Sequence, residues 1–191
     1  MKRKMEQVGF LRGMLLLFFA GFLLGLGFLF GFRDSLTGYI HSFYGGICSN
    51  LAIYEIEEWQ LFLQVAGTEL GCFLLLVLFG ISILGIPVLV LFPLYKGFIG
   101  GALCGSLVIE FSGKGILAGL VYGFPQQLLY IPVLLAVLHK NYIIGLQGLK
   151  KKLFLEQLPS IVILAMLLLV GCFTEAYINS WIMKKLLLWI G

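Results

Sequence analysis

Five residues that carry charge or form hydrogen bonds stand inside otherwise apolar stretches: Glu69, Lys96, Gln126, Gln127 and Glu175. Within a lipid bilayer such side chains are costly, so they face the protein interior and often mark ion, proton or substrate pathways. Counted from the turn at 110–115, Lys96 and the glutamine pair fall at similar depth on neighbouring segments. Lys96 could therefore donate to carbonyl groups at the glutamine pair. Glu69 is expected about 12 Å below the outer face, so its contact with Lys96 stays open.

A second interpretation of the same residues buries no charge. If a helix runs over about 70–94, Lys96 lies at the cytoplasmic interface and Glu69 at the outer one, where long side chains reach water. Gln126 and Gln127 would then bond between helices, at about 0.6 kcal/mol each on average.

Residue types for catalysis or metal binding are present but not arranged to act together. His41 falls in an outer polar segment and His139 at an inner boundary, and no HExxH motif or Gly-rich phosphate loop occurs. The four cysteines lack CxxC spacing and are expected to be small apolar side chains in membrane helices: Cys48, Cys72, Cys104 and Cys172. We therefore predict no enzymatic activity and no metal or cofactor.

The composition predicts an integral membrane protein. Of 191 residues, 61% are hydrophobic and 12% charged, whereas soluble domains average about 45–50% and about 25%. The net charge of +4 comes from short flanks beside apolar runs, MKRK at the start and LKKK at 149–152, which is typical of cytoplasmic anchors. We expect lipid, and no nucleic acid, as a partner.

Five membrane-crossing helices are predicted, since each needs about 20 mostly apolar residues. The expected architecture is an all-α, polytopic bundle in one membrane domain, 1–191. Its parts are helices at about 10–32, 61–84, 87–109, 116–138 and 158–180, an external loop at 33–60 and a cytoplasmic loop at 139–157. The first apolar run resembles a signal peptide but is interpreted as an uncleaved helix.

Basic residues predict the orientation of the bundle. A cytoplasmic N-terminus places the basic flank and the 139–157 loop inside and the acidic 33–60 segment outside. Lys184 and Lys185 disagree, because five crossings leave them outside.

Prolines and glycines predict where these helices break. Gly85 and Pro87 separate the second and third crossings, because proline donates no backbone hydrogen bond and disfavours helix in the residue before it. In the fourth crossing, Pro125 and Pro132 are expected to bend the helix so that its glutamines face inward.

Glycines at every fourth position predict a close helix pair: Gly97, Gly101 and Gly105, then Gly115, Gly119 and Gly123. Such spacing lets a neighbouring backbone approach closely. A hairpin at 110–115 would pair Gly105 with Gly115, Gly101 with Gly119, and Gly97 with Gly123. The first helix carries its own pairs, Gly21/Gly25 and Gly27/Gly31, for packing within the chain or with a partner, so oligomerisation stays open.

Aromatic residues of the expected external loop mark a candidate docking surface: Tyr39, Tyr44, Tyr54 and Trp59. Aromatics are enriched in protein interfaces. For Tyr54 and Trp59 the alternative is the aromatic belt at the membrane surface.

Two stretches resemble the stage II sporulation protein M family: LFGISILGIPVLVLFPLYKGFIGGALCGSLV (78–108) and PQQLLYIPVLL (125–135). The ending TEAYINSW is similar to the final helix of that family. The resemblance implies a multi-pass protein of the sporulation septum, in the mother-cell membrane. There it would act as a scaffold that localises peptidoglycan hydrolases for septal wall thinning and engulfment of the forespore.

Two other functions remain open. A permease or transporter subunit would use the polar residues as a midplane site, although the sequence shows no internal repeat of the kind common in transporters. The other possibility is that the protein is a distant relative of the family without a sporulation role.

Overall fold

The computed structural model describes residues 2–53, 57–80, 85–123, 126–146 and 151–190, and nearly all of them are helical. The elements are α1 (Lys2–Gly31), α2 (Arg33–Ile53), α3 (Glu58–Gly80), α4 (Gly85–Phe111), α5 (Gly113–Gly123), α6 (Gln127–Leu146), α7 (Lys151–Phe173), a π-helix η1 (Thr174–Asn179) and α8 (Ser180–Ile190). The predicted all-α class is confirmed.

Four helical stretches are long and apolar enough to cross a membrane: Gly9–Gly31, Glu58–Gly80, Pro87–Phe111 and Glu156–Leu187. The last runs through α7, η1 and most of α8. A fifth crossing arises if α5 and α6, bent by 55° relative to each other, form one broken span over Gly113–Gly123 and Gln127–Ile143. The chain is therefore a multi-pass membrane protein with four to five candidate spans.

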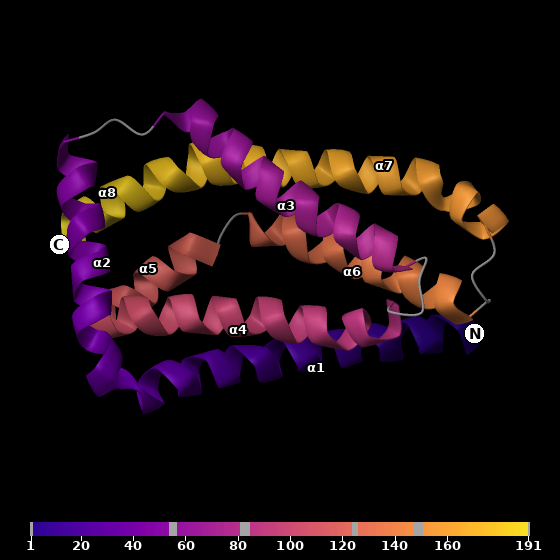
Figure 1. Ribbon diagram of the computed structural model, residues 1–191, viewed down its shortest axis with the longest axis horizontal. Helices are drawn as coiled ribbons and strands as arrows, with labels where there is room; N and C mark the ends of the chain where they lie inside the picture. Colours follow the sequence, from indigo (N-terminus) through magenta and orange to yellow (C-terminus); the bar gives the residue numbers. More distant parts are fainter. Residues whose placement is uncertain (1, 54–56, 81–84, 124–125, 147–150, 191) are drawn as a thin grey trace.

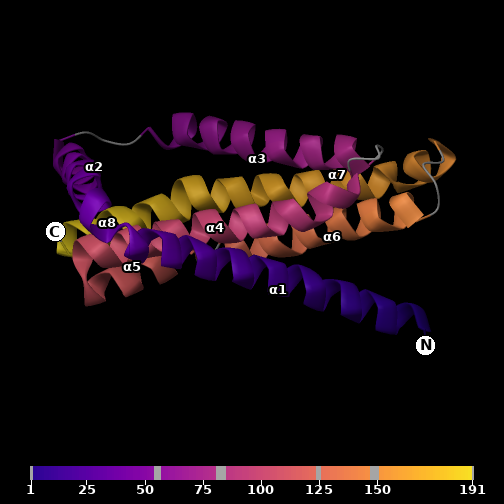
Figure 2. The same ribbon diagram turned by 60° about the horizontal axis from the view of Figure 1, so that its bottom comes forward.

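The spans run side by side, and the two termini lie at opposite ends of the bundle (Figure 1). Helix α2 lies across the end opposite the N-terminus, as both views show (Figures 1 and 2). If the N-terminus is cytoplasmic, as the basic flank predicts, α2 and α8 mark the outer end. That name is used below for the end that carries α2.

The segment expected as an external loop, 33–60, is largely the helix α2, and its place outside the membrane stays a prediction. Apolar residues recur in α2 at helical spacing and pack on the outer end of α4 and on α8: Leu36, Ile40, Tyr44 and Ile47. They belong to one apolar cluster with Leu107 of α4 and Ala118 of α5, both almost fully buried. Burial of this apolar stripe stabilises α2 as a helix.

Helices α1 and α4 pack with their backbones in close contact. A Cβ added at Gly97 or Gly101 would lie 2.1 Å from the backbone oxygen of Phe18 or Phe22. Glycines of α1 make the same kind of contact with the backbone of α4, because a Cβ at Gly21 would lie 2.1 Å from the Leu94 oxygen. Only residues without side chains allow two helix backbones to approach this closely.

The glycine-to-glycine pairs expected between the third and fourth crossings are wrong, although α5 does pack against α4. A Cβ at Gly119 would lie 3.2 Å from Cys104 Sγ of α4. α5 has only 11 residues, so it is too short to follow α4 past its outer end. Gly105 faces Leu26 and Leu29 of α1 instead. Gly115 still serves close packing, because a Cβ there would lie 2.0 Å from the Leu107 oxygen at the turn, whereas Gly123 has only Gln127 nearby, at 3.8 Å.

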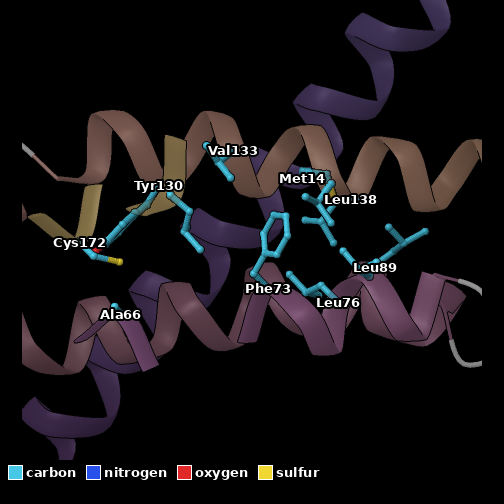
Figure 3. Close-up of a cluster of buried hydrophobic side chains, with 12 residues drawn as sticks. Met14, Ala66, Phe73, Leu76, Leu89, Tyr130, Val133, Leu138 and Cys172 are labelled. Atoms are coloured by element: carbon cyan, nitrogen blue, oxygen red, sulfur yellow. The ribbon is translucent and has the colours of Figure 1, made fainter. Parts of the chain in front are cut away.

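A second packing layer joins α3, α6 and α7. A buried cluster contains residues of all three helices: Phe73 and Leu76 of α3, Val133 and Leu138 of α6, and Cys172 of α7 (Figure 3). Asn141 of α6 donates a 2.8 Å hydrogen bond to the Leu76 carbonyl. These contacts hold α3, α6 and α7 together.

The glycine contact makes a prediction about stability. Gly101→Ala should destabilise the protein by roughly 1–3 kcal/mol, because the added methyl group meets a rigid backbone. Gly27→Ala is the matched control, since nothing lies within 4 Å of a Cβ there. It should be neutral or stabilising by up to about 1 kcal/mol, because alanine favours helix. Thermal unfolding in detergent measures both, and equal effects would contradict the packing.

Candidate functional site

A cavity of about 260 Å³ lies at mid-depth between α1, α3, α4, the α5–α6 break, α6 and η1. Its lining is mostly apolar, and it is called the polar cavity below because charged and amide side chains stand in that lining. All five polar residues singled out in the sequence line it, although they come from different segments: Glu69, Lys96, Gln126, Gln127 and Glu175. Tyr122 and Tyr130 add phenol groups, and α1 supplies an apolar wall. The fold therefore brings polar side chains from distant parts of the sequence to one cavity.

Glu69 and Lys96 form an ion pair inside the bundle. The Lys96 Nζ donates to both carboxylate oxygens of Glu69, at 2.7 and 3.1 Å. Their side chains are only 15% and 26% exposed. Lys96 thus pairs with Glu69, the contact that the sequence left open, and not with the glutamine region.

The helix bounds explain why both charges lie deep. Glu69 lies 11 residues from each end of α3, so it is about 16 Å from either end and deeper than expected. α3 ends at Gly80 and α4 starts at Gly85. The interpretation with a helix at 70–94 and both charges at the interfaces is therefore wrong.

Helix breaks are present at two of the places where glycine and proline residues predict them. Gly85 is the first residue of α4 and Pro87 falls in its first turn, where the missing N–H costs no helical hydrogen bond. The second break separates α5 from α6; Pro125 lies outside the described residues. Pro132 does not end α6, which continues through it.

Gln126 stands at this second break and is almost fully buried, with 1% of its surface exposed. Its Nε2 donates to the Tyr122 carbonyl at 2.6 Å, and the Asn179 Nδ2 donates to the same oxygen at 3.2 Å. A carbonyl freed by a helix break in lipid needs such donors. The Oε1 of Gln126 has no hydrogen-bond partner in the described part of the chain.

Glu175 reaches the cavity from the π-helix η1. The Tyr130 hydroxyl donates to its Oε2 at 2.7 Å, and Gly171 leaves room for that ring, since a Cβ there would lie 2.5 Å from Tyr130 Cε1. Single π-helical turns occur frequently at functional sites. Sequence reasoning missed Tyr122, Tyr130 and Asn179; a tyrosine inside the run LLYIP is the one signal that could have indicated Tyr130.

The cavity has more acceptors than donors. With Glu69, Lys96 and Glu175 ionised, the formal charges sum to one negative, and Lys96 is already engaged by Glu69. In the described residues, no three His, Cys, Asp or Glu side chains come close enough together to hold a metal ion. The arrangement favours a small cation that donates hydrogen bonds.

A larger cavity of about 600 Å³ lies between α1, α3 and α4, and it is almost wholly apolar. Leu24, Leu75 and Leu91 line it and are largely exposed on the bundle surface. It offers hydrocarbon chains dispersion contacts but no polar recognition.

Aromatic residues at the outer end take different places. Tyr39 is 78% and Trp59 61% exposed, whereas Tyr54 lies outside the described residues. Tyr44 is buried and shares a 2.8 Å hydrogen bond with Ser106 Oγ, and burial raises the pKa of its phenol. The prediction that Tyr44 belongs to an exposed docking surface is therefore wrong.

These features define a multi-pass helical membrane protein with a polar cavity in the middle of the bundle. The chain matches the family model of stage II sporulation protein M over residues 14–180, and it belongs to this family. The match includes α1 from residue 14 onward and all of α2, for which the sequence offered no family motif. No curated protein and no solved structure matches the chain significantly.

The ion pair makes a second prediction. Lys96→Met should destabilise the protein by roughly 3 kcal/mol, because it leaves the Glu69 carboxylate buried without its cation. Adding Glu69→Gln should recover most of that loss. Lys114→Met, which removes an exposed lysine above the Trp189 ring, should cost no more than about 1 kcal/mol. Thermal unfolding in detergent of these three variants, of Glu69→Gln alone and of the wild type measures the coupling, and additive losses would contradict a buried pair.

Proposed function

We propose that this protein is a non-enzymatic membrane scaffold that localises peptidoglycan hydrolases at the sporulation septum. There it would support thinning of the septal wall and engulfment of the forespore. The observation that carries the proposal is membership of the stage II sporulation protein M family over most of the chain. Partners of this kind act on the wall, so they must meet the scaffold at its outer end.

Helix α2 is the surface that best suits such a partner. Tyr39 and Phe43 stand one turn apart on it and are 78% and 62% exposed. Large aromatics are the residues that most often dominate binding at protein interfaces. The candidate docking surface therefore consists of Tyr39, Phe43 and the exposed face of α2 beside them.

Small residues form the part of α2 that points away from the bundle. They recur at helical spacing and are all exposed: Ser35, Gly38, Ser42 and Gly45. A smooth face of this kind lets a partner approach the backbone closely. The aromatics at its side would then supply most of the buried apolar area.

Contacts with the spans hold α2 in place. Ile40 and Tyr44 are buried, and His41 Nδ1 lies 2.9 Å from Glu110 Oε1 at the end of α4. A partner therefore meets a preformed helix and loses little affinity to the cost of ordering it.

One observation favours the alternative, a permease or transporter subunit. The polar cavity lies at mid-depth beside a broken helix, as substrate sites of many transporters do. The double variant Glu69→Gln/Lys96→Met separates the two functions, because it removes both charges without leaving either one unpaired. Hydrolase recruitment should survive it, whereas transport through the cavity should fall at unchanged protein level.

The docking surface makes a third prediction. In a spore-forming host that lacks its own copy, Tyr39→Ser/Phe43→Ser should abolish the septal enrichment of fluorescently labelled hydrolases. Ile116→Ser/Leu120→Ser is the matched control, since these α5 residues share the spacing and are 59% and 67% exposed at the same end. Membrane levels of both variants are compared by immunoblot. Retained enrichment in the α2 variant would exclude this surface.

A further inference from the structure

We propose that the mid-depth cavity binds a primary ammonium group between the Glu175 carboxylate and the Gln126 side-chain oxygen. This inference concerns a ligand of the membrane bundle and does not depend on hydrolase recruitment. It rests on an unpartnered buried acceptor, on the charges of the lining and on two helix irregularities that meet there.

The Gln126 amide is fixed in one orientation. Its other arm contacts the Tyr122 carbonyl at 2.6 Å, and a carbonyl accepts only from the nitrogen of the amide. Among the described residues the Oε1 atom consequently has no donor, and only 1% of the residue is exposed. A buried acceptor without a donor costs about 1–3 kcal/mol, so a ligand that donates to it gains a matching advantage.

The charges of the cavity lining favour a positively charged donor. Lys96 already neutralises Glu69 at 2.7 Å, whereas Glu175 accepts only a neutral phenol hydroxyl from Tyr130 among the contacts of the described residues. An ammonium group supplies three N–H donors and one positive charge. It can serve Glu175, Gln126 Oε1 and one phenol oxygen together.

Gln126 and Glu175 line the same cavity, and each stands at a local departure from the α-helix. Gln126 follows the break between α5 and α6, and Glu175 lies in η1, whose wider turn shifts its side chain relative to a continuous α-helix. Aromatic rings of α1, Phe18 and Phe19, face the same cavity. Ring faces attract organic cations, so this wall suits the carbon atoms of an amine.

The size of the cavity selects a small group. About 260 Å³ is below the range of about 300–1,000 Å³ that drug-sized ligands use. Phe19 and Ile99 of the lining are 58% and 37% exposed on the lipid-facing surface. The ammonium group can therefore belong to a free amine or to the head of an aminophospholipid that enters from the side.

The test uses the full-length protein in phosphatidylcholine nanodiscs, with thermal unfolding followed by tryptophan fluorescence. Ethanolammonium chloride should raise the unfolding midpoint saturably. Choline chloride and sodium chloride at equal ionic strength should not, because choline has no N–H donor and sodium donates no hydrogen bond. No shift with ethanolammonium, or an equal shift with choline or sodium, would overturn the proposal without any variant.

Variants then locate the site. Glu175→Gln should weaken the apparent ethanolammonium affinity by at least about tenfold, and Gln126→Leu by about fivefold, as lost hydrogen bonds to a charged group predict. Glu58→Gln, an exposed carboxylate at the start of α3, is the control and should bind like the wild type. If Glu175→Gln does not fold, Gln126→Leu decides. Wild-type affinity in the folded cavity variants would overturn the site.

A separate experiment identifies the source of the amine. Native mass spectrometry of protein from mixed nanodiscs should show retained phosphatidylethanolamine over phosphatidylcholine if a lipid head occupies the cavity. Absence of that preference, together with the soluble ethanolammonium shift, assigns a free amine. Either result supports the ammonium site, and loss of both signals rejects it.

Discussion

The structure depends on one constraint: a polar group at bilayer depth has no water and must find its partner inside the bundle. Lys96 meets Glu69, Tyr130 meets Glu175, and the Tyr122 carbonyl freed by the helix break receives donors from Gln126 and Asn179. These contacts tie α3 to α4, α6 to η1 and the α5–α6 break to η1. Polar pairing therefore determines which helices face the centre.

Close packing of α1 on α4 completes the enclosure. The glycines of both helices bring their backbones together, so that Phe18 and Phe19 of α1 form a wall of the cavity in place of lipid. The same contact leaves the outer end of α4 free to receive α2 through Leu107. One helix pair thus links the buried polar centre to the exposed surface at the outer end.

The sequence predicted the class of fold and the polar residues well, because apolar length and isolated charges are local signals. It could not predict which residues and helices contact one another. A glycine every fourth residue indicates a face open to close contact, but Gly97 and Gly101 meet α1 and not α5, which is too short. The apolar run at 61–109 has no polar gap, so whether Glu69 meets Lys96 depended on bounds that hydropathy does not give.

Two other features have weak sequence signals. α2 places one apolar stripe among serines, glycines and charges, and the high polar content concealed the helical period. The π-helix at Thr174–Asn179 follows no composition rule. It arises within an otherwise continuous apolar helix, where Ser180 Oγ and its backbone N–H both donate to the Glu175 carbonyl.

The most direct measurement of the central claim is time-lapse imaging of spore formation in the chain's own host after its deletion. Labelled peptidoglycan hydrolases and membranes would be followed together. A scaffold at the septum predicts that the hydrolases spread over the cell membrane and that the engulfing membranes stop at a flat septum. Hydrolases that still gather at the septum, with engulfment completed on time, would contradict the account.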